Sequence, residues 1–165
     1  MSVLCIAGTI AESIVDGPGI RFVVFTQGCP HHCEGCHNPQ THDFDGGTEM
    51  DTADILAQMR ENPLLSGVTL SGGEPFCQPE PLLEIAKAVH AAGKTVMAYS
   101  GYTFEQLCGS EDPAVRALLA ECDILVDGPF VLAERDLTLR FRGSRNQRLI
   151  DVSKSLKEKN VVEIE

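Results

Sequence analysis

Three cysteines lie close together in the segment TQGCPHHCEGCHNPQ. Cys29, Cys33 and Cys36 follow the pattern C-x3-C-x2-C, and histidines are interleaved with them. A structural zinc site needs four ligands around one ion, and His37 or His42 could supply the fourth. An iron-sulfur cubane held by only three thiolates leaves one iron with an open position, to which a small molecule can bind. The spacing alone leaves both interpretations open.

The elements that must position these cysteines follow from the hydrophobic pattern. Apolar runs rich in β-branched residues, each followed within a few residues by glycine, predict buried strands at 20–26, 68–70, 94–99 and 124–126. Helical patterns alternate with them at 50–62, capped by Asp51 or Thr52, at 79–93, stopped by Gly93, and within 112–121. Strands that alternate with helices predict an α/β fold with a parallel sheet.

The unusual residues all come directly after these strands. The cysteine segment follows the first strand, SGGEP the second, SGY the third and DGPF the fourth. The carboxyl ends of parallel strands lie at the same edge of a sheet, and α/β proteins bind their ligands there. We therefore expect these four loops to form one site.

Length and composition limit the possible functions. The 165 residues suit one domain, which we expect to span 1–165, and the formal net charge of -11 argues against nucleic acid as a partner. No stretch reaches the roughly 18 to 20 apolar residues of a membrane span, and the first residues resemble no export signal. We therefore expect a cytoplasmic protein that does not contact a membrane. Seven cysteines, an odd number, favour metal or redox chemistry over a disulfide framework.

The motifs together resemble a known family. C-x3-C-x2-C after a first strand, with a glycine-glycine-acid loop after a later strand, is the pattern of the radical S-adenosylmethionine enzymes. The stretch DGPGIRFVVFTQGCPHHCEGCHNP is similar to the members that activate glycyl-radical enzymes. LSGGEP, YSGY, ILVDGPF and RFRGSRNQRLID, in this order, resemble the activating proteins of anaerobic ribonucleoside-triphosphate reductase. The resemblance covers nearly the whole chain and implies an incomplete parallel (β/α) barrel of the radical SAM type.

The resemblance also implies two cofactors, a 4Fe-4S cluster and S-adenosylmethionine (SAM). The cluster would be held by Cys29, Cys33 and Cys36, and the amino and carboxylate groups of SAM would chelate the fourth iron. A fourth cysteine would close the iron that SAM must reach. The residues expected to contact SAM lie in three of the loops and are Gly35, Cys36, His37, Gly72, Gly73, Glu74 and Ser100.

Each of these contacts has an expected role. His37 would form a wall beside the adenine, and Gly73 would leave space for the methionyl group, because a side chain there would occupy the ligand's place. Glu74 would accept a hydrogen bond from the SAM ammonium, and Ser100 would reach the ribose or the carboxylate. The radical comes from the cofactor, so no side chain is expected to be catalytic in the acid-base sense.

The remaining histidines and cysteines have less specific interpretations. His31 and His32 are expected to be bystanders, solvated on the loop or hydrogen-bonded to cluster sulfides. Cys5, Cys108 and Cys122 are expected to be small core residues.

Three features stay open at this point. Cys77 follows the SGGEP loop closely, but no second motif supports a role for it. Asp127 suits either an active-site loop or a simple Asp-Gly turn. The basic segment Arg140 to Arg148 is either a solvated edge or a group that pairs with the SAM carboxylate or with acidic residues of a partner.

The function implied by the resemblance is that of an activase. It would cleave SAM reductively and abstract hydrogen from one glycine of the large subunit of an anaerobic ribonucleoside-triphosphate reductase, using a reducing electron donor such as flavodoxin. The first alternative is an activase of another glycyl-radical enzyme, such as pyruvate formate-lyase. The alternative from a different class is a zinc-binding interaction module without enzymatic activity, which would be colourless and hold one zinc ion per chain.

Overall fold

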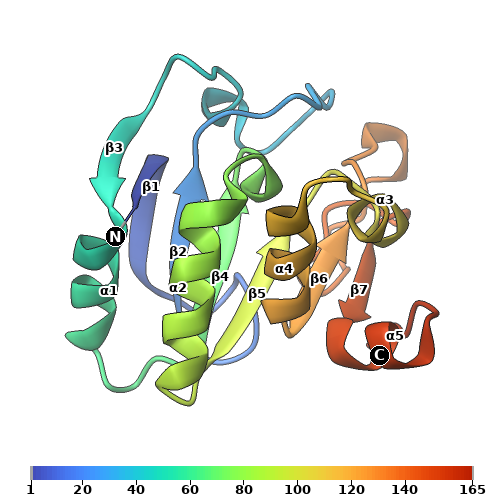
Figure 1. The fold of residues 1–165 in the computed structure, drawn as a ribbon. Helices are drawn as coiled ribbons and strands as arrows, with labels where there is room; N and C mark the ends of the chain where they lie inside the picture. Colours follow the sequence, from blue (N-terminus) through green and yellow to red (C-terminus); the bar gives the residue numbers. More distant parts are fainter. Residues whose placement is uncertain (1, 165) are drawn as a thin grey trace.

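The computed structural model describes residues 2–164 and contains one seven-stranded sheet (Figure 1). The strands are β1 (Val3–Ser13), β2 (Arg21–Thr26), β3 (Thr48–Asp51), β4 (Gly67–Gly72), β5 (Thr95–Tyr99), β6 (Ile124–Asp127) and β7 (Arg148–Asp151). Their order across the sheet is β3-β1-β2-β4-β5-β6-β7. The helices are α1 (Thr52–Arg60), α2 (Pro79–Ala91), α3 (Phe104–Cys108), α4 (Pro113–Glu121) and α5 (Val152–Glu158).

Four parallel strands form the centre of this sheet. β2 pairs with β4, β4 with β5 and β5 with β6, all in parallel. β1 and β3 extend one side of the sheet and β7 the other, and all three pair antiparallel to their neighbours. The α/β fold class is therefore confirmed, with a mixed sheet in which the four central strands are parallel. The four predicted strands and three predicted helices are all present, whereas β1, β3, β7, α3 and α5 were not predicted.

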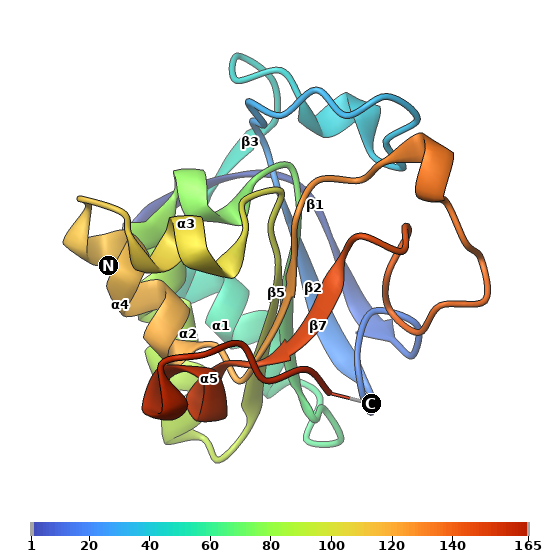
Figure 2. The same cartoon turned by 90° about the vertical axis from the view of Figure 1, so that its right-hand side faces the viewer.

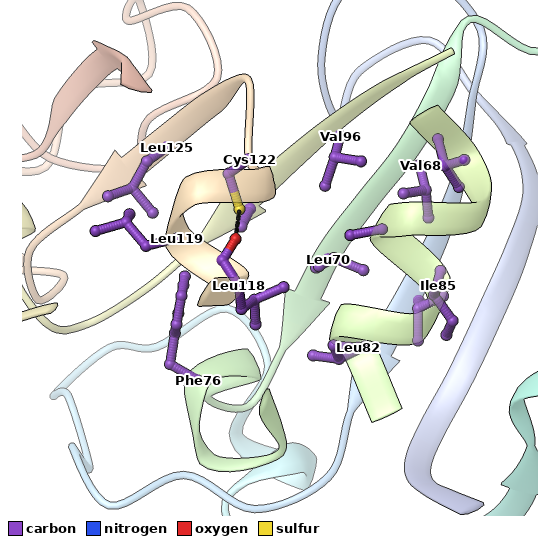
Figure 3. Packing of buried hydrophobic residues seen from close by; sticks show 14 of the residues in the cluster. Val68, Leu70, Phe76, Leu82, Ile85, Val96, Leu118, Leu119, Cys122 and Leu125 are labelled. Carbon is purple, nitrogen blue, oxygen red and sulfur yellow. Dashed lines mark hydrogen bonds between the residues drawn. The ribbon is translucent and has the colours of Figure 1, made fainter. Parts of the chain in front are cut away.

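The described helices lie on one face of the sheet (Figures 1 and 2). Successive side chains of a strand point to opposite faces, so alternate apolar residues of the parallel strands contact these helices. Figure 3 shows this core, in which α2 and α4 pack against β4, β5 and β6; it labels Val68, Leu70, Phe76, Leu82, Ile85, Val96, Leu118, Leu119, Cys122 and Leu125. In the part of the chain that the structure describes, we find no helix with the length and apolar character needed to cross a bilayer.

The helix boundaries follow local capping. Asp51 caps α1 by accepting a hydrogen bond from the backbone N–H of Ala53 at 2.9 Å, as expected from an Asp before a helix. Gly93 lies just after α2 with φ of +77°, a conformation that favours glycine, and the Lys94 N–H bonds back to the Val89 carbonyl at 3.1 Å.

A buried arginine closes the amino ends of the parallel strands. Arg21 is only 1% exposed, and its guanidinium donates to the hydroxyl of Thr69 at 2.9 Å, to the carbonyl of Val68 at 2.9 Å and to both oxygens of Thr95. Burial lowers the pKa of Arg21 to about 10. The four loops predicted to form the site leave the strands at the opposite end, the carboxyl end, of the parallel strands.

Candidate cluster and cofactor site

The three clustered cysteines line one small pocket of about 110 Å³ at the carboxyl ends of the strands. Cys29 is buried, and Cys33 and Cys36 are half-buried. A larger cleft of about 740 Å³ adjoins this pocket, and the two share the wall residues Cys36, Gly72, Tyr99, Phe130 and Gln147. The cleft has the size of a small-molecule site. The cysteine, Gly-Gly-Glu, SGY and DGPF loops all contribute to the pocket wall, as predicted.

Backbone hydrogen bonds hold both ends of the cysteine loop together. The Gly28 N–H donates to the Thr41 carbonyl at 2.7 Å, and the Cys29 N–H donates to the His42 carbonyl at 3.1 Å. Gln27 directly precedes Gly28, and its side-chain amide donates to the Gln40 carbonyl at 3.1 Å and to the Asp43 carbonyl at 2.6 Å. The loop is therefore anchored to the end of β2 (Figure 2).

The Gly-Gly-Glu loop packs against this anchor. The Gly73 N–H donates to the Thr26 carbonyl and the Glu74 N–H to the Gly28 carbonyl, both at 2.8 Å. A Cβ at Gly73 would lie 2.4 Å from the Gly28 oxygen and 2.9 Å from the Thr41 oxygen. The space that Gly73 leaves free is therefore occupied by the backbone of the cysteine loop, which differs from the expectation that it makes room for ligand.

Glu74 is fully buried and accepts hydrogen bonds from three loops. Its carboxylate receives the Ser100 hydroxyl at 2.9 and 3.0 Å, the Gly101 N–H at 2.8 Å and the Phe76 N–H at 3.0 Å. The Nε2 atom of His31 lies 2.6 Å from the same carboxylate. The Ser100 hydroxyl has one proton shared between the two oxygens, so four donors meet the about four lone-pair sites of the carboxylate. The Ser100 hydroxyl, expected to face SAM, is engaged here as well.

Comparisons with known proteins agree with this geometry. Residues 15–150 match the model of the family described as "4Fe-4S single cluster domain". The anaerobic ribonucleoside-triphosphate reductase-activating protein of Haemophilus influenzae is 34% identical over 144 residues, which cover 81% of this chain and 89% of that protein. The chain belongs to this family of activating proteins. The family resemblance predicted from the motifs is thereby confirmed.

Two further comparisons are more limited. The pyruvate formate-lyase-activating enzyme of Clostridium pasteurianum is 43% identical over 97 residues, which cover 55% of this chain and 41% of that enzyme. Among solved structures, QueE from Escherichia coli matches with a TM-score of 0.49 and 18% identity, covering 61% of this chain and 54% of that one.

The side chains of the family's cysteine motif fit a 4Fe-4S cluster. Three thiols line one pocket, and the Asn38 N–H points at the Cys36 sulfur at 3.4 Å, a donor of the kind that stabilises thiolate ligands of such clusters. Burial raises the pKa of the Cys29 thiol, while the backbone amides of His31 and His32 act in the opposite direction. Within residues 2–164, no three Cys, His, Asp or Glu side chains are grouped around one point as the ligands of a single ion would be.

His31 is the residue whose position the sequence interpretation missed. Instead of being a solvated bystander it contacts Glu74, and its ring meets the Tyr102 ring edge-on with centroids 4.5 Å apart. His32, by contrast, is exposed, with φ of +49°. The only hint in the sequence is that His31 lies between two cysteines of the motif.

Gly35 and His37, which are predicted to lie beside the adenine, are located where the cysteine loop meets the segment that contains Phe130 and Leu132. Gly35 has φ of +74°, and a Cβ there would lie 2.8 Å from the Leu132 side chain. The ring of His37 lies 5.1 Å from that of Phe130, and both residues line the larger cleft. His37 is thus placed at a cleft wall, as the role predicted for it requires, and its contact with SAM stays a prediction.

Asp127 and Arg148 form a structural ion pair. The Arg148 Nε donates to Asp127 Oδ1 at 3.0 Å, and its guanidinium also contacts Glu105. Asp127 is 1% exposed and accepts the Phe104 N–H at 2.7 Å, so it ties the end of β6 to the first turn of α3. Hydrogen bonds to Asp127 and Glu105 raise the pKa of Arg148, which keeps it charged. Arg142 from the same basic segment lines the larger cleft.

The cysteines outside the motif differ in environment. All seven cysteines are free. Cys122 is buried, as predicted, and its thiol donates to the Leu118 carbonyl at 3.3 Å. Cys5 is half-buried, and Cys108 is exposed at the end of α3, so its assignment to the core was wrong. α3 buries Phe104 and Leu107, which leaves Cys108 at its last position exposed.

Proposed function

We propose that this protein is a radical SAM activase that generates the glycyl radical of an anaerobic ribonucleoside-triphosphate reductase. The observation that supports this most directly is the position of the three motif cysteines, which line one pocket that adjoins a cleft of about 740 Å³. A SAM-sized ligand can lie in that cleft while its amino-acid end reaches the cysteine pocket. When bound, the cluster and SAM supply the radical that removes hydrogen from the target glycine.

The chain itself provides confinement and orientation. Cys29, Cys33 and Cys36 would hold the 4Fe-4S cluster through three thiolates, which would leave one iron free to bind SAM. The wall of the larger cleft combines small and polar side chains of the sheet, such as Ser71, with aromatic ones, such as Tyr99. A target glycine must come into near contact with the reactive carbon, and the cleft has room for both reactants. We infer that His37 and Gly72 contact SAM along this wall, and that Gly73 and Ser100 contribute to the adjoining cysteine pocket. The contacts predicted for Gly35 and Glu74 stay predictions.

The partner and the compartment follow from the same proposal. The relatives that match most of this chain carry the reductase in their names. The pyruvate formate-lyase-activating enzyme matches this chain over less than half of that enzyme's length. A net charge of -11 supports a protein partner rather than nucleic acid. Seven free cysteines suit a reducing cytoplasm. We infer a reducing electron donor such as flavodoxin because reductive cleavage of SAM needs an electron.

A direct test mixes the anaerobically reconstituted protein, a reductant and SAM with the reductase of the same organism. We expect a glycyl-radical signal in electron paramagnetic resonance (EPR) that requires all components. The parallel sample with a pyruvate formate-lyase should give little or none, and a signal only with the lyase would assign the protein to the alternative activase. Measurement of iron, sulfide and zinc on the same preparation separates both from the zinc-binding module.

A further inference from the structure

The Glu74 carboxylate connects loops that are far apart in sequence. Ser100 and Gly101 follow β5, and Phe76 follows β4, so these three partners lie at the carboxyl ends of neighbouring strands. His31 is the one described partner that comes from inside the cysteine loop, 43 residues away from Glu74 along the chain. The contact therefore joins the segment between two motif cysteines to the sheet.

The His31 ring fits closely into its place. Its side chain is 16% exposed, although the residue lies on a loop whose neighbours Pro30 and His32 are exposed. A Cβ on Gly101 would lie 2.3 Å from His31 Cδ2 and 2.6 Å from Nε2, so the ring fills the space that this glycine leaves. The Tyr102 ring borders it edge-on. The imidazole is therefore confined on two sides, by Gly101 and by the Tyr102 ring.

We propose that His31 is a positioning residue: its contact with Glu74 locks the cysteine loop against the Gly-Gly-Glu and SGY loops and so fixes the pocket that Cys29, Cys33 and Cys36 line. This inference rests on the function proposed above. The base of the loop is fixed through Gly28 and Cys29, but among the described residues the stretch from 30 to 35 makes no backbone hydrogen bond to the sheet. The imidazole supplies that link from its middle. Glu74 acts in this arrangement as the acceptor that holds His31.

The test compares four variants with the full-length wild-type protein. His31→Phe keeps a ring against Tyr102 but removes the N–H donor, and His31→Gln keeps a donor of similar reach. Gly101→Ala leaves His31 in the sequence but pushes its ring away from Glu74. His32→Asn is the matched control, because it changes an exposed neighbouring histidine and asparagine tolerates the positive φ.

The readouts are iron and sulfide per chain after anaerobic reconstitution, and the change that SAM causes in the EPR spectrum of the reduced cluster. A hydrogen bond to a charged group contributes about 1.5–3 kcal/mol, so we expect His31→Phe to bind SAM roughly ten- to a hundredfold more weakly. It should also lose iron faster in air. Gly101→Ala should behave similarly, His31→Gln should recover most of the wild-type affinity, and His32→Asn should match wild type.

Wild-type cluster content and SAM response in both His31→Phe and Gly101→Ala would overturn the proposal. So would His31→Gln being as defective as His31→Phe, because the ring and not the hydrogen bond would then matter. If His31→Phe does not fold, the proposal is tested by comparing Gly101→Ala, which should be defective, with His31→Gln, which should be close to wild type. If the wild-type protein itself binds no cluster, the proposed function fails. The role of the His31–Glu74 contact is then tested by limited proteolysis of the segment 30–38. Faster cleavage of His31→Phe than of wild type supports the proposal, and an unchanged rate refutes it.

Discussion

Replacement of Gly73 by alanine tests whether the Gly-Gly-Glu loop is shaped mainly by the cofactor or by the protein. The new Cβ would lie 2.4 Å from the Gly28 oxygen and 2.9 Å from the Thr41 oxygen, both of them backbone atoms that cannot rotate away. Gly73 does not have a positive φ, so the expected cost is steric and not conformational. The loops must separate, and the anchor of the cysteine loop must shift with them.

The size of the effect follows from what the separation breaks. The hydrogen bonds at stake are Glu74 N–H to Gly28, at 2.8 Å, and Gly28 N–H to Thr41, at 2.7 Å. A backbone hydrogen bond contributes about 1 kcal/mol net, and overpacking of a tight site costs about 1–3 kcal/mol, so we expect a loss of about 2–3 kcal/mol. For a chain of this length that lowers Tm by roughly 5–10 °C. Cluster content should fall in parallel.

The assay is thermal unfolding of the protein before and after anaerobic reconstitution, with iron measured on the same samples. Gly8→Ala is the matched control, because Gly8 lacks a positive φ and a Cβ there meets nothing within 4 Å. It should leave both Tm and iron content nearly unchanged. If Gly73→Ala instead kept wild-type Tm and iron content and lost only SAM affinity, the packing argument would be refuted and the ligand-space interpretation restored.

Two further predictions concern the cluster and the pH dependence of stability. Cys29→Ala, Cys33→Ala and Cys36→Ala should each abolish reductive SAM cleavage, measured as release of 5'-deoxyadenosine, whereas Cys108→Ala should retain it; a dispensable motif cysteine would contradict the ligand assignment. Both ring nitrogens of His90 lie 2.8 Å from carboxylates, Nδ1 from Glu121 and Nε2 from Asp123, so the ring must be protonated to donate to both. Burial acts to lower the pKa of His90, but the hydrogen bonds to Asp123 and Glu121 outweigh it and raise the pKa. The free energy of folding that protonated His90 contributes is fully present below about pH 6.5 and is lost as the pH rises through the folded-state pKa. Because His90 and its two carboxylates are partly exposed, we expect this contribution to be about 0.3–1 kcal/mol. The measurement is the difference in unfolding free energy between wild type and His90→Gln as a function of pH. A difference that grows with pH would contradict this.

The centre of the fold could be predicted because its signals are local. The β2 run IRFVVFT and the β5 run KTVMAY are continuous and β-branched, as strands buried on both faces are, and α2 has prolines at its start and a glycine after its end. β7 and α3 have only four and five residues, so their sequences contain too little periodicity to detect. β1 is long, but only part of it alternates in burial. The edge strands β3 and β7 form because the neighbouring strand offers its free backbone hydrogen-bonding groups.

The site divides in the same way between local motifs and long-range contacts. The cysteines and the Gly-Gly-Glu loop could be found because each is a contiguous motif at the end of a predicted strand. The role of Glu74 could not, since its donors come from residues 31, 76, 100 and 101, and their meeting depends on the register of β4 and β5.

A buried carboxylate needs such partners before any ligand arrives, because an unpaired charge at 0% exposure would be far more costly than the loop order that pairs it. The same acid that a motif suggests as a cofactor ligand is therefore already saturated by the protein. For the SAM ammonium to reach it, His31, Ser100 or a backbone N–H would have to be displaced. Of these, only His31 belongs to the loop that receives the cluster, so the loop that carries the cysteines is also the one whose position Glu74 controls.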